Sequence, residues 1–336
     1  MYFYANNIIY QNKSEAILKN TQENRSYLYY HDEVWDKIDW TIEPEGSLDF
    51  HYKMQAQRIR DEYDYVILCY SGGYDSTNIL EAFYYNNIKL DKIVTQGAFK
   101  QDSFTGSDEN QNGEIYKNVF PNIKQFGLDN ILQVIDHSEF YSDITKLSVY
   151  EMGENWVDDI GDRYSPHNWF WRDIHKYVVP EKYQDKKVAI IFGTDKPHLV
   201  KNSAGLLGFS FNSVALTSYA RYKNPRQPNI EDVNFYWDPN YPLIILKQLH
   251  TMKKLNITGS QTEKSIHDAI YNLKNPLVHK SEKSMTTRRG LRDNFLFEKH
   301  QNSDAFKFYQ LGMERYKKLY ACWQLHIPTK FYAIEK

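Results

Sequence analysis

Short runs of consecutive hydrophobic residues alternate along the chain with segments whose hydrophobic residues recur at helical spacing. The runs predict buried strands at 66–70, 92–97, 131–135 and 187–192. The helical spacing predicts helices at 48–62, at 75–86 and at places between Ser142 and Tyr177. Strands and helices that alternate in this way are typical of an α/β fold with a doubly wound parallel sheet.

This alternation weakens beyond about residue 205, and we expect three parts. Residues 1–60 form an N-terminal extension, 61–205 the α/β domain, and 206–336 a mainly helical region that covers the site. Four prolines interrupt the pattern in the last part: Pro225, Pro228, Pro239 and Pro242. The hydrophobic spacing becomes helical again between Asp304 and Leu325.

The most informative segment joins the first strand to the helix after it, and consists of Ser71, Gly72, Gly73, Tyr74, Asp75, Ser76 and Thr77. Adjacent glycines permit positive φ and let a ligand approach the backbone closely. The hydroxyl groups of the segment and the start of a helix favour a bound anion. Asp75 would repel a phosphate unless a divalent cation lay between them, so we expect Mg²⁺ there. A serine-glycine turn without a ligand is the alternative.

Two other strands end in glycine, and a parallel sheet brings such ends to one edge. Gly97 ends the strand 92–97, where it permits a flat ligand to approach or simply ends the strand. Gly193 ends the strand 187–192 and is followed by Thr194, Asp195 and Lys196. We expect Asp195 to share the metal with Asp75 and Lys196 to neutralise phosphates, the alternative being a surface turn.

The SGGYDS run resembles the SGGxDS signature of the PP-loop superfamily of ATP pyrophosphatases, and within it proteins like the synthetase domain of asparagine synthetase. It is not a Walker A loop, which ends in GKS or GKT. The resemblance implies a fold of the adenine nucleotide alpha hydrolase (HUP) type that binds ATP and Mg²⁺. It also implies that adenine lies near Gln96 and Gly97.

Several members of that superfamily carry a Pro-x-Arg-Asn segment whose last two residues face the nucleotide or substrate. Pro166, His167 and Asn168 stand at the similar place here, with histidine in the arginine position. The resemblance implies that Asn168 contacts the nucleotide and that His167 has a catalytic role. The aromatic residues that follow are candidates for packing or an interface.

The amino-acid composition excludes several kinds of chemistry. The chain has 336 residues, a net charge of −2 and only two cysteines, Cys69 and Cys322. Two distant cysteines exclude a disulfide framework, a Cys-only zinc site and most of the superfamily's sulfur chemistry. No hydrophobic run reaches the roughly 20 residues of a membrane span, so we expect a cytoplasmic protein without a membrane partner.

The expected function is that of an AMP-forming ligase, or amidotransferase-like enzyme, that adenylates a carboxylate or carbonyl oxygen of a small-molecule substrate. Tyr2 stands where some glutaminases carry a nucleophilic cysteine, so we expect the amine or ammonia to come from outside the chain. A nucleobase- or tRNA-modifying enzyme is the alternative, with a basic run at 280–292 as the docking patch. A nucleotide-binding module without turnover is another, and a homodimer stays open.

Overall fold

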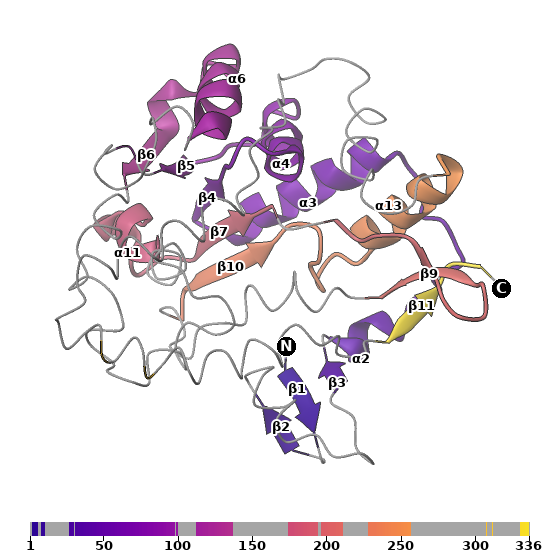
Figure 1. The fold of residues 1–336 in the computed structure, drawn as a ribbon. Helices are drawn as coiled ribbons and strands as arrows, with labels where there is room; N and C mark the ends of the chain where they lie inside the picture. Colours follow the sequence, from indigo (N-terminus) through magenta and orange to yellow (C-terminus); the bar gives the residue numbers. More distant parts are fainter. Residues whose placement is uncertain are drawn as a thin grey trace.

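The computed structural model describes the following residues of the chain: 2–5, 8–10, 27–29, 31–97, 99, 112–136, 174–193, 196–210, 228–256, 307, 311 and 330–335. Within them, a parallel sheet forms the centre of the fold, and two small antiparallel sheets lie apart from it (Figure 1). Among these residues no helix is long and apolar enough to cross a membrane.

The central sheet has five strands in the order β10-β7-β4-β5-β6, and all neighbouring pairs are parallel. Their bounds are β4 Tyr65–Cys69, β5 Lys92–Gly97, β6 Leu132–Asp136, β7 Val188–Phe192 and β10 Ile230–Asn234. Counted along the chain, this order is 3-2-1-4-5. The direction in which strands are added therefore reverses between β4 and β7, and such a reversal creates a crevice beyond the carboxyl ends of the two strands.

Helices cover both faces of this sheet. Their bounds are α3 Leu48–Glu62, α4 Tyr74–Tyr84, α6 Phe120–Phe126, α11 Ile174–Val178 and α13 Leu243–Lys254, with a π-helical turn, η2, at Ile115–Val119. A short helix, α2 Asp32–Trp35, lies away from the sheet, beside β3 and β11 (Figure 1). Val66 and Leu68 point into the core shared with α3, α4, α6 and α13, whereas Ile67 and Cys69 point to the face that α11 covers. Burial on both faces explains why the strands read as unbroken hydrophobic runs.

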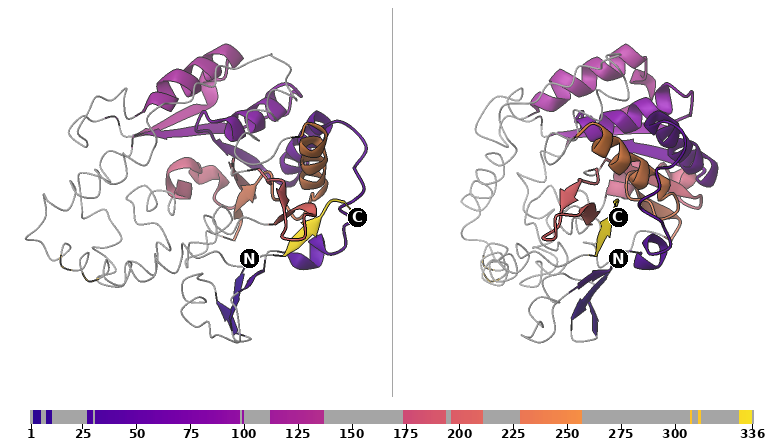
Figure 2. Two further views of the ribbon diagram at one scale, coloured as in Figure 1. Left: turned by 45° about the vertical axis from the view of Figure 1, so that its right-hand side comes forward. Right: turned by 90° about the vertical axis from the view of Figure 1, so that its right-hand side faces the viewer.

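The first small sheet contains β1 Tyr2–Ala5, β2 Ile8–Tyr10 and β3 Tyr27–Tyr29, and the second contains β8 Val200–Lys201, β9 Leu207–Ser210 and β11 Phe331–Ala333. Strand β11 thus returns from the C-terminal part of the chain to the segment that follows β7. Trp40 packs against the rings of Phe209 and Tyr332, with centroids 4.7 and 5.3 Å away. Two further views show α3 and α13 side by side above this sheet (Figure 2).

The structure confirms a parallel α/β sheet. Helix α3 has the predicted bounds, and the four predicted strands agree with β4, β5, β6 and β7 to within one residue at each end. Strand β10 was missed: it lies in the region expected to be mainly helical, yet it forms one edge of the central sheet. Residues of all three expected parts contribute to the larger core, among them Trp35, Leu68 and Tyr332.

Candidate functional site

The turn between β4 and α4 packs against the π-helical turn η2, mainly against its last two residues, Asn118 and Val119. Gly72 has a φ of 81°, a conformation that favours glycine. A Cβ at this position would also lie 2.8 Å from Cβ of Asn118. The Asn118 side-chain amide donates a hydrogen bond of 2.9 Å to the Gly72 carbonyl. Both backbone geometry and close contact therefore require glycine at position 72.

Hydroxyl groups within the turn fix its shape. The Ser71 and Ser76 hydroxyls lie 3.1 Å apart, and the Ser76 hydroxyl also donates to the Gly73 carbonyl at 3.2 Å. Helix α4 then begins at Tyr74. Its N-cap residue is Gly73, so no side chain caps the first amides of the helix. Ser71 is exposed and Gly73, Tyr74 and Asp75 are half-buried. These residues are the part of the turn that a ligand could reach.

Thr77, which the sequence assigns to the same ligand, lies on the core side of the turn. It is fully buried, and its hydroxyl is 3.2 Å from the Tyr70 hydroxyl. Asn122 donates a second hydrogen bond to Tyr70 at 2.8 Å. Burial raises the pKa of Tyr70 to about 12, against the opposite effect of these hydrogen bonds, so the phenol is neutral at physiological pH. In this structure Thr77 anchors α4 to the end of β4.

The end of β7 lies directly against the first turn of α4. A Cβ built on Gly193 would be 2.8 Å from the Ser76 nitrogen and 3.0 Å from its Cα. Glycine is needed here so that strand and helix can approach each other. The parallel pairing of β4 with β7 sets this distance, because Cys69 is level with Phe192 in the register. The two predicted loops are therefore neighbours in space.

Lys196 forms an ion pair with Asp75 across this junction. The Lys196 side chain is fully buried, whereas that of Asp75 is 15% exposed. The Tyr236 ring lies 4.7 Å from the Lys196 ammonium, and the Tyr236 hydroxyl donates to the Asp75 carbonyl at 2.7 Å. Burial and, after it, the negative charge of Asp75 raise the pKa of Tyr52. The Asp75 carboxylate is thus close enough to the buried interior to affect the pKa of Tyr52.

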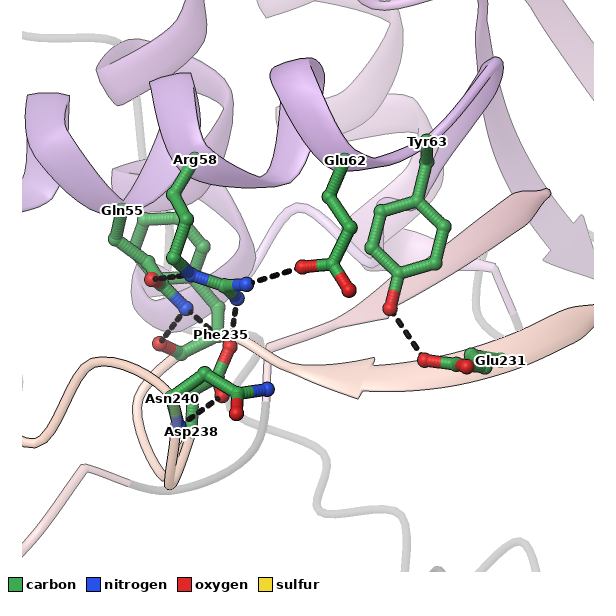
Figure 3. A network of polar contacts seen from close by, with 8 residues as sticks. All are labelled: Gln55, Arg58, Glu62, Tyr63, Glu231, Phe235, Asp238 and Asn240. Atoms are coloured by element: carbon green, nitrogen blue, oxygen red, sulfur yellow. Dashed lines mark hydrogen bonds and ion pairs between the residues drawn. The ribbon is translucent and has the colours of Figure 1, made fainter.

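A polar network on α3 holds the segment that carries Tyr236 (Figure 3). The Gln55 side chain donates to the Phe235 carbonyl at 3.3 Å and to Asp238 at 2.9 Å. Arg58 forms an ion pair with Asp238. The Tyr63 hydroxyl donates to Glu231, which lies on β10. The chain on both sides of Tyr236 is consequently fixed to α3.

Gly97 has a close neighbour within the protein. A Cβ there would lie 2.5 Å from Oδ1 of Asn112 and 2.8 Å from Cδ1 of Ile115. These atoms lie at the ends of side chains, so the contacts are compatible with both interpretations of this glycine. Gln96 is half-buried next to it, at the end of β5.

The structure brings together Ser71, Gly72, Gly73, Asp75, Ser76, Gly193 and Lys196. Asp195, His167, Asn168 and the basic run 280–292 lie outside the described residues. Within the described part, no group of three or more His, Cys, Asp or Glu side chains could hold a metal ion.

Sequence reasoning missed Asn118 and Tyr236. Neither residue belongs to a motif. The only signal for Tyr236 was an aromatic stretch, Phe235-Tyr236-Trp237, before the turn at Asp238.

The site combines a helix start, a partly exposed glycine turn and a buried ammonium group. The first amides of a helix have no intrahelical partner and carry the positive end of its dipole. With Lys196 beside them, these groups favour an anion with several oxygen atoms. No protein-family model matches the chain, and no curated protein was found to be similar to it.

Proposed function

We propose that this chain is an ATP pyrophosphatase of the PP-loop type, which binds ATP at the β4–α4 turn and splits it between its α- and β-phosphates. One observation carries the proposal. Asp75 of the SGGYDS turn and Lys196 beyond β7 form an ion pair at the point where the strand order reverses. Open α/β sheets commonly bind their ligands at that point.

In this proposal the backbone of Gly73 and the first turn of α4 receive the β- and γ-phosphates. Lys196 supplies positive charge from the β7 side, where the leaving pyrophosphate gains negative charge. Catalysis of this kind depends on positioning and electrostatics, so the rigid support of the turn by Asn118 and Tyr70 has a direct role. The acceptor oxygen of a carboxylate or carbonyl group attacks the α-phosphorus, and an amine or ammonia then displaces AMP.

Asp75 suits a magnesium ion, because Mg²⁺ is usually held by one or two carboxylates together with substrate phosphates. When bound, the ion would neutralise charge on the phosphate oxygens. Asp195 is the second residue proposed for it, and Gln96 and Gly97 are proposed to lie near adenine. Asn168 and His167 keep their proposed roles at the nucleotide and the reacting groups.

Two alternative functions would use the same nucleotide site. A nucleobase- or tRNA-modifying enzyme would use it with a different acceptor. A nucleotide-binding module would bind ATP without turnover, but the presence of both Asp75 and Lys196 in one ion pair favours a site that handles the charge of a leaving group.

The test is incubation of the full chain with α-labelled ATP, Mg²⁺ and pools of carboxylates, nucleosides or tRNA. We expect labelled AMP, whose yield depends on one of the pools. Asp75→Asn should abolish magnesium-dependent turnover, while Asp61→Asn, on the exposed side of α3, should leave it unchanged. Labelled ADP as the product would refute the proposal, and tight ATP binding without turnover would favour the binding module.

A further inference from the structure

The cation next to Asp75 in this structure is part of the chain itself. The ammonium group of Lys196 pairs with the Asp75 carboxylate, which is the residue proposed to hold magnesium. Because the Lys196 side chain is fully buried, its charge has little access to water. A buried charge is costly unless it stays paired, so the ammonium cannot simply leave Asp75 for solvent.

Tyr236 holds both members of this pair in place. Its ring lies 4.7 Å from the ammonium, within the range of a cation–π interaction. Its hydroxyl donates to the Asp75 backbone carbonyl at 2.7 Å. Tyr236 itself is fully buried and packs against Tyr52, with ring centroids 5.8 Å apart. The three residues therefore form one connected, largely buried cluster, which we call the Asp75–Lys196–Tyr236 unit.

We infer that Lys196 occupies the cation position at Asp75 until a polyphosphate arrives, so that a divalent metal binds this site much more tightly together with the polyphosphate than alone. The inference rests on the proposed function for the identity of the ligand. A metal ion alone would place two cationic groups on one carboxylate. A polyphosphate supplies new oxygen anions for the ammonium, and Asp75 can then take the metal.

This exchange makes metal and polyphosphate binding mutually dependent. Coupled binding sites typically change each other's affinity by a factor of about 5 to 150. We expect the affinity of Asp75 for a divalent metal to rise at least about tenfold when pyrophosphate is present, within that range. Tyr236 acts as a positioning residue, because it keeps the ammonium at Asp75 when no ligand is bound.

The experiment measures Mn²⁺ binding to the full chain by electron paramagnetic resonance, with and without pyrophosphate. At each pyrophosphate concentration, Asp75→Asn is the reference, and the difference from it gives the metal bound at Asp75. This subtraction removes both surface carboxylates and Mn²⁺ chelated by free pyrophosphate. Wild type should bind Mn²⁺ at Asp75 at least about tenfold more tightly with pyrophosphate than without it. Lys196→Met should bind it without pyrophosphate, and Lys196→Arg should behave as wild type.

Tyr236→Leu and Tyr236→Phe provide a second route if Lys196→Met does not fold, as judged by near-UV circular dichroism. Tyr236→Leu removes ring and hydroxyl and should permit Mn²⁺ binding without pyrophosphate. Tyr236→Phe keeps the ring and should change binding less. Equal Asp75-dependent Mn²⁺ affinity of wild type with and without pyrophosphate, or no gain in either Lys196→Met or Tyr236→Leu, would overturn the inference. Failure of wild type to bind pyrophosphate or ATP under any condition would instead refute the proposed function.

Discussion

Gly193 lies where β7 meets the first turn of α4, and its replacement by alanine tests the packing that joins the two halves of the site. The new Cβ would lie 2.8 Å from the Ser76 nitrogen, 3.0 Å from Ser76 Cα and 3.1 Å from the Asp75 carbonyl carbon. All three are backbone atoms, so no flexible side chain can move aside. Relief to an ordinary contact of 3.4 Å requires a shift of about 0.6 Å (3.4 − 2.8).

A shift of this size must move α4 away from β7 or bend the strand. Overpacking in a close-packed interior typically costs about 1–3 kcal/mol, and we expect Gly193→Ala to lower the free energy of unfolding by that amount. Because Asp75 moves with α4, its ion pair with Lys196 should weaken. ATP binding should weaken with it, since the same turn carries the proposed phosphate site.

The assay is urea denaturation followed by fluorescence and circular dichroism, with ATP binding measured by calorimetry. Gly113→Ala is the matched control, because a Cβ at Gly113 meets nothing within 4 Å. That substitution should be neutral or stabilise by about 0.4–1 kcal/mol through the unfolded state. If Gly193→Ala has the same stability as wild type within about 0.5 kcal/mol, the close contact between β7 and α4 is not present.

Three further substitutions test other parts of the structure. Tyr70→Phe leaves the buried groups of Thr77 and Asn122 without the phenol and should cost about 1–3 kcal/mol in urea denaturation. Asp238→Ala removes the carboxylate that accepts from Gln55 and pairs with Arg58. It should lower the free energy of unfolding by about 2–3 kcal/mol. This is less than breaking a fully buried ion pair costs, because the Arg58 side chain is 23% exposed. Glu43→Gln should lose less unfolding free energy than wild type as the pH falls from about 4.5 toward 2.

The last expectation follows from the sign of the pKa shift. Burial raises the pKa of Glu43, but hydrogen bonds from Lys247 and Lys254 outweigh it and lower the pKa from 4.5 to about 2. A group whose pKa is lower in the folded state contributes stability that is fully present above pH 4.5 and is lost as the pH falls toward about 2. The contribution is reduced by solvent screening, since the Glu43 side chain is 24% exposed.

Each of these predictions has an outcome that contradicts it. Tyr84→Phe, at an exposed tyrosine of α4, is the control for Tyr70→Phe, and equal effects would show that the Tyr70 hydrogen bonds contribute nothing. Equal stability of Asp238→Ala and wild type would mean that the network on α3 does not hold the segment after β10. If the free energy of unfolding falls equally with decreasing pH in Glu43→Gln and wild type, Glu43 does not have the proposed role.

Local patterns were sufficient for most of the central sheet. The residues of β4 and β7 are buried on both faces, so their hydrophobic runs were unambiguous. The glycine turn after β4 was legible because adjacent glycines and a helix start occur together. Strand β10 could not be recognised in the sequence. Its buried residues, Ile230 and Val233, are separated by polar residues, and prolines precede it.

The contacts of the site could be predicted only in part. Strand ends of a parallel sheet meet at one edge, which brought Asp75 and Lys196 into one hypothesis. The pattern could not give the strand order, and so it could not show that Lys196 pairs with Asp75 directly. Thr77 was assigned to the ligand because it lies in the turn, but the rotation of α4 points it at Tyr70. Tyr236 depends on tertiary packing alone.

We propose that the Asp75–Lys196 junction serves the cleavage of ATP between its α- and β-phosphates. The most direct measurement uses ATP that carries different labels on the α- and γ-phosphates, incubated with the full chain, Mg²⁺ and the acceptor pools. We expect the α-label in AMP and the γ-label in pyrophosphate, and we expect Lys196→Met to lose both products. Release of the γ-label as inorganic phosphate, with the α-label in ADP, would contradict the proposal.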